Sequence, residues 1–360
     1  MNNRIIVGIS GGVDSSVTAL LLQKKGFDVE CVFMKNWEGN DDEYCTAEED
    51  YKDALAVCDH LGLPLRSVNF SQEYWDKVFQ HFIDEYKKGR TPNPDVLCNR
   101  EVKFKAFLDY ALELGAEKIA TGHYSIIDES NGDFKLLKGL DPGKDQSYFL
   151  YLLGQNALSK SIFPIGDIEK KEVRKLAEES GLVNHAKKDS TGVCFIGEQK
   201  FFKEFLKKYI PSNPGMIETI DGKECGKHDG LMYYTIGQRK GLGIGGGYGK
   251  LEAPWFVAEK DLYRNVLIVA QGHTHPALYH KQLFADQIHW IRGLVPEDLS
   301  GLSAKIRYRQ SDQKCKITEL SQDRCTVVFD KPQFAITPGQ SVVFYRDNEC
   351  LGGAVIDRRK

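Results

Sequence analysis

The N-terminal part of the chain alternates short apolar runs with amphipathic segments. Residues 4–9 (RIIVGI) are almost entirely apolar, which is typical of a strand buried on both faces. A helix is expected at 15–25 and a second strand at 27–35, and such short connections favour a parallel sheet. The pattern continues downstream, with helices expected at 48–62, 104–116, 170–181 and 198–210 and strands at 65–70 and 118–124.

The pattern changes after the turn-forming stretch PSNPG at 211–215. Asp221 and Gly222 separate two short alternating runs, as the turn of a hairpin does. From about residue 281 the runs AKIRYR, KCKITEL, RCTVVF and QSVVFY alternate apolar and polar residues, which is typical of a small β-barrel or sandwich. We therefore predict three domains: an α/β domain with a parallel sheet over 1–210, a small β-rich central domain over 211–280 and a C-terminal β-barrel-like domain over 281–360.

The composition is that of an ordinary globular protein. With 360 residues, 41% hydrophobic and 28% charged, the chain is long enough for two or three domains with a substantial core. The N-terminus lacks the basic and apolar layout of a secretory signal, and no uncharged apolar run approaches the roughly 20 residues that span a bilayer. We expect a cytoplasmic protein with no membrane partner.

Cysteine count and charge narrow the chemistry further. Nine cysteines are an odd number in a chain too large to need disulfides for stability, so most are expected to be reduced, with one redox-active pair left open. No CxxC occurs, and His273 and His275 have no nearby third ligand, so no structural zinc site is expected. The net charge of −3 argues against a nucleic-acid partner, but residues 281–360 hold 13 Lys and Arg against 10 Asp and Glu. A local basic surface therefore remains compatible with the sequence.

The stretch ISGGVDSS at 9–16 joins the first predicted strand to the first predicted helix. A glycine-rich turn in this position presents backbone N–H groups and the positive end of a helix to an anion. Gly11 and Gly12 let the backbone approach closely, and the serine hydroxyls add donors. Because Asp14 would repel a phosphate without a cation between them, we predict Mg²⁺ with Asp14 as its ligand.

The loop matches neither GxGxxG nor GxxxxGK followed by Ser or Thr, so the usual dinucleotide and Walker loops are excluded. It resembles the SGGxDS loop of the PP-loop ATP pyrophosphatases, whose fold is of the adenine nucleotide α-hydrolase type. Those families split ATP between its α- and β-phosphates and adenylate an oxygen of their substrate, so the resemblance implies ATP. A plain Gly-Ser helix cap is the alternative interpretation.

Two cysteines lie in settings that favour a reactive thiol. The prolines of TPNPDVLCNREVKF (91–104) disfavour helix up to about Asp95, so Cys98 is expected near a helix start, where the helix end favours a thiolate. Cys194 lies in a Ser-Thr-Gly loop. Both have basic neighbours: Arg100 and Lys103 for Cys98, Lys187 and Lys188 for Cys194. An inert thiol is the alternative for each, and these residues alone do not decide between the two.

Over essentially its whole length the chain resembles the tRNA-specific 2-thiouridylases, which convert the wobble uridine in the anticodon stem-loop of tRNA to 2-thiouridine. Eight motifs in order carry the resemblance: GISGGVDSSV (8–17), FMKNW (33–37), PNPDVLCNREVKF (92–104), ATGHY (120–124), GKDQSYFL (143–150), DSTGVCFIG (189–197), YTIGQRKGLG (234–243) and RYRQ (307–310).

The resemblance implies two sets of binding residues. The implied ATP contacts are Gly8, Ile9, Ser10, Gly11, Gly12, Val13, Asp14, Ser15, Met34 and Gly122. The implied tRNA contacts are Asn93, Pro94, Asp95, His123, Lys144, Asp145, Gln146, Arg307, Tyr308 and Gln340. Arg and Lys suit phosphates, and an extruded base can be stacked and read on its edges. A solvated face of an alternating strand is the alternative for Arg307 and its neighbours.

The resemblance also implies the chemistry. The uridine O2 attacks the α-phosphate of ATP, giving an O-adenylated base and pyrophosphate. A persulfide on Cys194, supplied by a sulfur carrier protein or a cysteine desulfurase, then provides the sulfur, and a Cys98–Cys194 disulfide forms that a cellular reductant resets. Cys98 either attacks the activated carbon or reduces the persulfide, and Asp95 resembles the family's acid–base carboxylate.

Two other classes of function stay open on the residues themselves. A PP-loop synthetase acting on a small metabolite would consume ATP without regard to tRNA, and both cysteines would then be incidental. A non-enzymatic RNA-binding protein would bind tRNA without ever releasing pyrophosphate.

Overall fold

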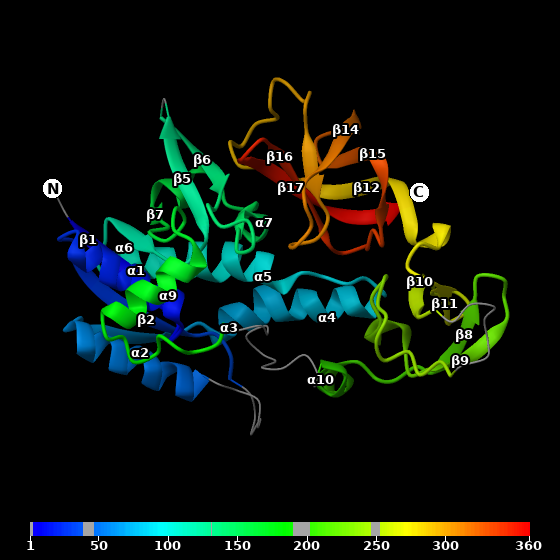
Figure 1. Cartoon of the computed structure of the whole chain (residues 1–360), viewed down its shortest axis with the longest axis horizontal. Helices are drawn as coiled ribbons and strands as arrows, with labels where there is room; N and C mark the ends of the chain where they lie inside the picture. The colour runs from blue at the N-terminus through cyan, green and yellow to red at the C-terminus, as the bar shows by residue number, and fades with distance from the viewer. Residues whose placement is uncertain (1–2, 39–46, 131, 190–201, 246–252) are drawn as a thin grey trace.

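The computed structural model describes residues 3–38, 47–130, 132–189, 202–245 and 253–360. Figure 1 shows three regions: helices around a sheet at the N-terminal end, a small group of central strands, and a barrel built by the C-terminal part of the chain. Among the described residues, no helix has the length and apolar character needed to cross a membrane. The predicted domain boundaries after residues 210 and 280 stay predictions.

The N-terminal region is built on a parallel sheet of five strands in the order β3-β2-β1-β4-β7. The strands are β1 (Arg4–Ile9), β2 (Asp28–Lys35), β3 (Leu65–Asn69), β4 (Lys118–Ala120) and β7 (Ser161–Ile162). The predicted parallel sheet is therefore confirmed. The chain runs outward from β1 to β3 and then returns to place β4 on the other side of β1. Parallel α/β proteins bind their ligands at such a reversal of strand order, beside the carboxyl ends of the strands. Below, this side of the sheet is called its carboxyl edge.

Alternation along β1 decides which helices cover which face of the sheet. Ile5, Val7 and Ile9 lie in one buried cluster, together with residues of α1 (Val13–Lys24), α2 (Ala47–Leu61) and α9 (Lys170–Glu179). Ile6 lies in the other large cluster, with Phe107 and the rest of the helical segment that precedes β4. Because successive side chains of a strand point to opposite faces, a run that is apolar throughout is buried on both sides, as predicted. Other helices of the described residues include α3 (Ser71–Tyr74), α4 (Gln80–Lys87), α7 (Ser147–Leu150), α8 (Gln155–Ser159), α10 (Phe202–Tyr209) and short 3₁₀ helices at Leu231–Tyr233 and Pro276–Leu278.

The helical segment that carries Cys98 begins earlier than its prolines suggested. Pro94 is the first residue of α5 (Pro94–Leu97), which continues into a π-helical stretch (Cys98–Ala106) and then into α6 (Phe107–Glu113). The expectation of no helix before Asp95 was wrong because the first helical position needs no N–H donor, so proline is favoured there. Cys98 consequently lies in the second turn. A second π-helical stretch, Trp75–Phe79, precedes α4.

The central strands form an antiparallel hairpin joined to a second one. Their order is β10-β11-β8-β9, with β8 (Gly215–Thr219), β9 (Glu224–His228), β10 (Trp255–Asp261) and β11 (Val266–Gln271). The predicted hairpin around Asp221 and Gly222 is confirmed, and Gly222 has a φ of 78°. Glycine reaches this left-handed conformation without strain, which is why the turn closes there.

The C-terminal strands close into a six-stranded barrel. Its strands are β12 (Tyr279–Trp290), β13 (Ser303–Lys305), β14 (Gln313–Leu320), β15 (Arg324–Phe334), β16 (Ser341–Arg346) and β17 (Glu349–Arg359), and pairing of β12 with β17 completes the closure. Leu283, Val327 and Phe344 are buried in its interior. The run AKIRYR was expected to be one strand, but β13 ends at Lys305, so Arg307 and Tyr308 lie in the turn that follows.

One hairpin of the N-terminal region extends the barrel sheet. The strands β5 (Ser125–Ser130) and β6 (Asp133–Lys138) are antiparallel, and β6 pairs with β17 through Leu137 opposite Glu349. The residues just after α4 contact both β regions. Arg90 binds Asp357 of β17 in the barrel at 3.1 Å, and Lys260 of the central strand β10 donates to the carbonyl of Gly89. Figure 1 shows α4 running beneath the barrel toward the central strands. All three regions therefore meet around the chain from α4 to α5.

Candidate active site

The SGGVDSS loop turns sharply between β1 and α1. Gly11 has a φ of 73°, and the hydroxyl of Ser15 accepts from the Ser10 amide at 3.1 Å while donating to the Gly12 carbonyl at 3.0 Å. Gly12 caps α1 in an extended conformation without a side-chain bond to the helix. The first-turn amides of α1 therefore face the carboxyl edge of the sheet, as an anion site requires.

Three glycines allow the loop to pack closely against its neighbours. A Cβ added at Gly122 would lie 2.8 Å from backbone atoms of Asp14 and Ser15, and one at Gly11 would lie 2.2 Å from the Asp50 carbonyl oxygen. A Cβ at Gly8 would lie 3.0 Å from the terminal methyl carbon of Met34. The structure thus brings Gly8, Met34 and Gly122, the predicted nucleotide contacts outside the loop, to the same edge as the loop itself.

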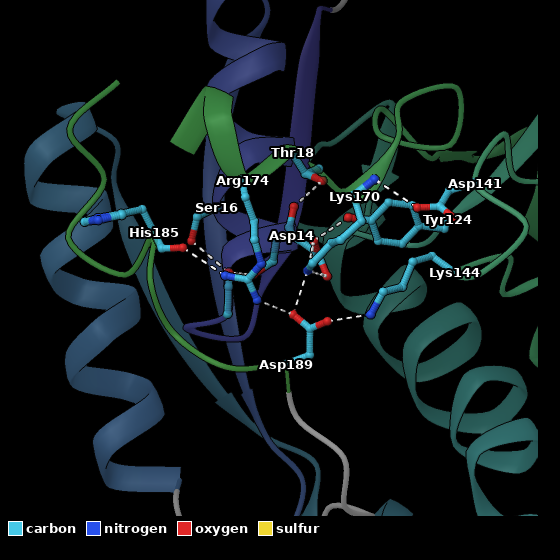
Figure 2. Close-up of polar contacts among 12 residues, drawn as sticks. Asp14, Ser16, Thr18, Tyr124, Asp141, Lys144, Lys170, Arg174, His185 and Asp189 are labelled. Carbon is cyan, nitrogen blue, oxygen red and sulfur yellow. Dashed lines mark hydrogen bonds and ion pairs between the residues drawn. The ribbon is translucent and has the colours of Figure 1, made fainter. Parts of the chain in front are cut away.

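Asp14 is held by a lysine and a tyrosine that the sequence did not single out. The ammonium of Lys170 lies 2.7 and 2.9 Å from the two carboxylate oxygens of Asp14, and the Tyr124 hydroxyl donates to Oδ1 at 2.6 Å (Figure 2). Burial and the negative charge of Asp14 raise the pKa of Tyr124, so the phenol stays protonated. Lys170 is the first residue of α9 and is only 8% exposed.

Asp189 receives three cations from two parts of the chain, since Lys170 and Arg174 both lie on α9. Lys170 Nζ lies 2.7 Å from it, Lys144 Nζ 2.6 Å and Arg174 2.7 Å. Burial opposes ionisation of this carboxyl, but the hydrogen bonds and charges of Lys144 and Lys170 outweigh it and lower the pKa of Asp189 to about 2. Figure 2 shows Lys170 between Asp14 and Asp189, so one ammonium joins the SGGVDSS loop to the residue where the DSTGVCFIG motif begins.

Asn184 holds the loop from the other side. Its amide donates to the Gly11 carbonyl at 2.9 Å and to the Ser16 hydroxyl at 3.0 Å. Sequence reasoning missed Asn184 and Lys170, and no local pattern marks either of them. Tyr124 and Asp189 do fall within the ATGHY and DSTGVCFIG motifs, which was the available signal.

The residues near Asp14 do not fit a metal ion held by the protein. Over the described part of the chain, no group of three or more His, Cys, Asp or Glu side chains could hold one. Both oxygens of Asp14, the predicted Mg²⁺ ligand, accept from the Lys170 ammonium. A Mg²⁺ ion shared between Asp14 and the phosphates of ATP stays a prediction. A lysine thus lies where the sequence analysis expected a cation.

Cys98 and Asp95 lie three residues apart on one helical segment, and such residues are neighbours on a helix surface. Cys98 is buried, whereas Asp95 is exposed to water on one side. Desolvation by the protein around it nevertheless raises the pKa of Asp95, with the charge of Lys103 opposing that shift. Cys194 lies outside the described residues, so the Cys98–Cys194 disulfide stays a prediction.

Two of the four basic neighbours expected to favour the thiolates are paired with carboxylates. Arg100 Nε bonds Glu101 at 2.7 Å, and Lys187 Nζ bonds Asp50 at 2.7 Å and also Asp53. Lys103 makes no ion pair with any residue that the structure describes. Among these residues, it therefore offers the least compensated charge near Asp95.

His123 is a neutral imidazole packed between two rings. It is 7% exposed, and burial lowers its pKa well below the ordinary value, helped by the charge of Lys103. Its Nδ1 lies 2.7 Å from the Thr121 hydroxyl. The centre of its ring lies 5.6 Å from the ring centre of Phe104 and 5.7 Å from that of Phe163. His123 can therefore stack or hydrogen-bond but does not supply a positive charge near neutral pH.

Most of the other predicted tRNA contacts lie where the barrel meets the N-terminal region. Tyr308 donates to the Lys144 carbonyl at 3.2 Å, and Gln340 donates to the Thr91 carbonyl at 2.8 Å. Asp145 is buried and binds Lys305 of β13 at 3.1 Å. The other contacts of this set are Gln146 with the Tyr124 amide, Asn93 and Pro94 at the start of α5, and Arg307 with the carbonyls of Ile236 and Ala335.

A glycine-rich anion loop at a strand-order reversal, joined to two β regions, defines a nucleotide-binding α/β protein with C-terminal accessory domains. Models of known families match almost the entire chain. Residues 3–198 match the tRNA methyl transferase HUP domain, 203–271 the tRNA methyl transferase PRC-barrel domain and 280–356 the aminomethyltransferase β-barrel domain.

Full-length relatives narrow the class to one family. The tRNA-specific 2-thiouridylase MnmA of Methylococcus capsulatus is 58% identical over 360 residues, which cover 99% of this chain and 97% of the relative. The enzyme of the same description from Francisella tularensis subsp. holarctica is 60% identical over 358 residues, or 99% of each chain. The chain therefore belongs to the tRNA-specific 2-thiouridylases, a family of tRNA sulfurtransferases.

Solved structures are similar over a smaller part of the chain. A 4-thiouridine synthetase–RNA complex with bound ATP is 21% identical, with a TM-score of 0.37, over 58% of this chain and 50% of that one. The U34-tRNA thiolase NcsA of Methanococcus maripaludis is 21% identical, with a TM-score of 0.36, over 58% and 67%. Similarity at this level adds no argument to the family assignment.

Proposed function

We propose that the chain is an ATP-dependent sulfurtransferase that converts the wobble uridine of tRNA to 2-thiouridine. The observation that carries the proposal is the convergence of Gly8, Met34 and Gly122 on the SGGVDSS loop at the switch point of the sheet. Helix α6, which continues the helical segment with Asp95 and Cys98, packs against the same edge, since a Cβ at Gly8 would lie 3.1 Å from the ring of Phe107. Membership of the thiouridylase family supports tRNA as the substrate.

The reaction has two stages. In the first, the C2 carbonyl oxygen of the uridine attacks the α-phosphorus of ATP, the bond between the α- and β-phosphates breaks, and pyrophosphate leaves. In the second, sulfur adds at C2 and the former carbonyl oxygen leaves with AMP. The sulfur comes from a Cys194 persulfide loaded by a sulfur carrier protein or cysteine desulfurase. The Cys98 and Cys194 thiols supply the two electrons that reduce it and end as a disulfide.

The described residues fit the first stage. The amides of the SGGVDSS loop and the first turn of α1 would bind the pyrophosphate part of ATP, because they face the sheet edge. The pKa of the Asp95 carboxyl is raised toward neutral pH. Such a shift suits a group that exchanges protons with the base. Cys98 follows one turn later on the same segment.

The tRNA would lie along the junction between the barrel and the N-terminal region. Lys144, Tyr308 and Gln340 come from both sides of this junction. Arg307 binds carbonyl oxygens and the Thr337 hydroxyl but no carboxylate among the described residues, so its charge is available to a phosphate. The buried, neutral His123 would contact the extruded base.

The test is a nucleoside digest. Unmodified tRNA is incubated with ATP, Mg²⁺ and a persulfide source, then digested, and 2-thiouridine is measured with and without ATP. ATP-dependent 2-thiouridine supports the proposal. ATP turnover that is stimulated by a small metabolite and leaves tRNA unmodified would refute it.

Cysteine variants separate the two stages. Cys194→Ala is expected to abolish 2-thiouridine while tRNA-dependent pyrophosphate release remains measurable. Cys225→Ser is the matched control, because Cys225 is a buried thiol of the central strands that donates to the Ile217 carbonyl, a bond that serine can keep. Thiolation by Cys194→Ala at the wild-type rate would contradict the role proposed for that residue.

A further inference from the structure

Lys170 reaches the nucleotide loop from a distant part of the sequence. It begins α9, and its own backbone N–H donates to Asp141 at 3.2 Å, which fixes the start of that helix. Its ammonium spans from Asp14 in the first turn of α1 to Asp189, and it lies 5.8 Å from the centre of the Tyr124 ring. Because the side chain is almost fully buried, the ammonium depends on these partners for its solvation.

The two carboxylates depend on Lys170 to different extents. Asp189 also binds Lys144 and Arg174, so it keeps two cations without Lys170. Among the residues that the structure describes, Lys170 is the sole cation paired with Asp14. Loss of the ammonium would leave Asp14 as a bare carboxylate in the first turn of the helix whose amides face the sheet edge.

An uncompensated carboxylate at this position opposes phosphate binding. Like charges a few ångströms apart repel strongly where the protein partly excludes water. A divalent ion on Asp14 could remove that repulsion, but both oxygens of Asp14 already accept from Lys170, and Oδ1 also accepts from Tyr124. The lysine meets the same electrostatic need without a metal.

We propose that Lys170 is the resident cation of the nucleotide loop: a positioning residue that neutralises and orients Asp14 so that the loop accepts the pyrophosphate end of ATP. Asp14 is then an anchor for Lys170 and not a metal ligand, and the Mg²⁺ of the assay enters bound to the phosphates of ATP. This inference rests on the proposed function for the identity of the nucleotide.

The test is a charge-compensation cycle read by direct ATP binding. Calorimetry measures the Kd of Mg-ATP for wild type, Lys170→Gln, Asp14→Asn and the double variant. Lys170→Gln is expected to raise the Kd at least 10-fold, because Asp14 becomes unpaired. Asp14→Asn is expected to change it less than about 3-fold, and adding it to Lys170→Gln should recover most of the lost affinity. A purely structural role of Lys170 predicts no such recovery.

Lys175→Gln is the matched control, because Lys175 lies on the same helix and, within the described part of the chain, pairs with Glu172 and Glu179 at the surface alone. It should bind Mg-ATP like the wild type. Lys170→Arg, which keeps the charge, should bind within about 3-fold of wild type and covers the case in which Lys170→Gln fails to fold.

A second measurement tests the metal directly. The Mg²⁺ concentration that gives half-maximal pyrophosphate release is compared between wild type and Asp14→Asn. An unchanged value supports the proposal, and a several-fold increase for Asp14→Asn would overturn it, as would wild-type ATP affinity in Lys170→Gln. Because the digest tests thiolation by the wild-type enzyme, its failure is distinguishable from failure here.

Discussion

Alanine at Gly122 would place a methyl group against the backbone of the nucleotide loop. The new Cβ would lie 2.8 Å from the Asp14 carbonyl carbon and the Ser15 nitrogen, and 3.0 Å from the Asp14 oxygen. Ordinary carbon contacts are about 3.5 Å or longer, so the loop would have to move by roughly 0.7 Å. These are backbone atoms, which cannot rotate away as a flexible side chain would.

The expected cost follows from this geometry. Overpacking of this kind costs about 1–3 kcal/mol, part of it as lost stability and part as displacement of the loop amides. We expect Gly122→Ala to lower the free energy of unfolding by about 1–2 kcal/mol. A further loss of about 1.4 kcal/mol in ATP binding would raise the Kd of Mg-ATP about tenfold.

Urea unfolding and calorimetric ATP titration measure the two effects. Gly154→Ala is the control, because nothing lies within 4 Å of its added Cβ and its φ of −99° suits alanine. Because Gly154 caps α8, where alanine is less favourable, the variant should lose less than about 1 kcal/mol of stability, and it should bind ATP normally. Wild-type stability together with wild-type ATP affinity in Gly122→Ala would refute the close packing of Gly122 on the loop.

Three further predictions concern buried charge, pH and hydrogen bonding. Lys305→Met leaves the buried Asp145 without its cation and should lower the free energy of unfolding by about 3–5 kcal/mol in urea; a loss below about 1 kcal/mol would contradict this. The pKa of Asp189 is about 2 in the folded protein, below its ordinary value, so its stabilisation is present above about pH 4 and is lost as the pH falls toward 2. Since the group is about one-third exposed, we expect wild type to lose only about 1 kcal/mol more than Asp189→Asn across that range in urea unfolding, and parallel pH profiles would argue against it. Asn184→Ala removes two hydrogen bonds to the loop and should raise the Kd of Mg-ATP, measured by calorimetry, about tenfold. An unchanged Kd would show that the loop keeps its conformation without Asn184.

The junction between the barrel and the N-terminal region has two kinds of contact. Lys305 with Asp145 is buried and binds the regions together, whereas Lys144 and Arg307 are only partly buried. Lys144 nevertheless pairs with Asp189, so a phosphate that attracts Lys144 would compete with that carboxylate. The predicted tRNA contacts are therefore connected to the residues around the nucleotide loop.

The sequence by itself determined the elements whose signal is local. The two-sided burial of β1, the anion loop after it and the hairpin at Gly222 follow from periodicity and from glycines at positions that need them. Local rules were wrong where two of them competed. Pro94 could end or begin a helix, and RYR alternates like a strand but lies in a turn beyond β13.

Only the tertiary structure decided which distant residues meet. Nothing near Lys170 in the sequence indicates Asp14, and nothing in β6 indicates β17. The periodicity of apolar residues indicates which side chains are buried, but it does not indicate their partners. The backbone groups of an edge strand, or a buried ammonium, can form hydrogen bonds with many different partners. The choice among them depends on how the whole chain packs, which is why the loop was predictable and its lysine was not.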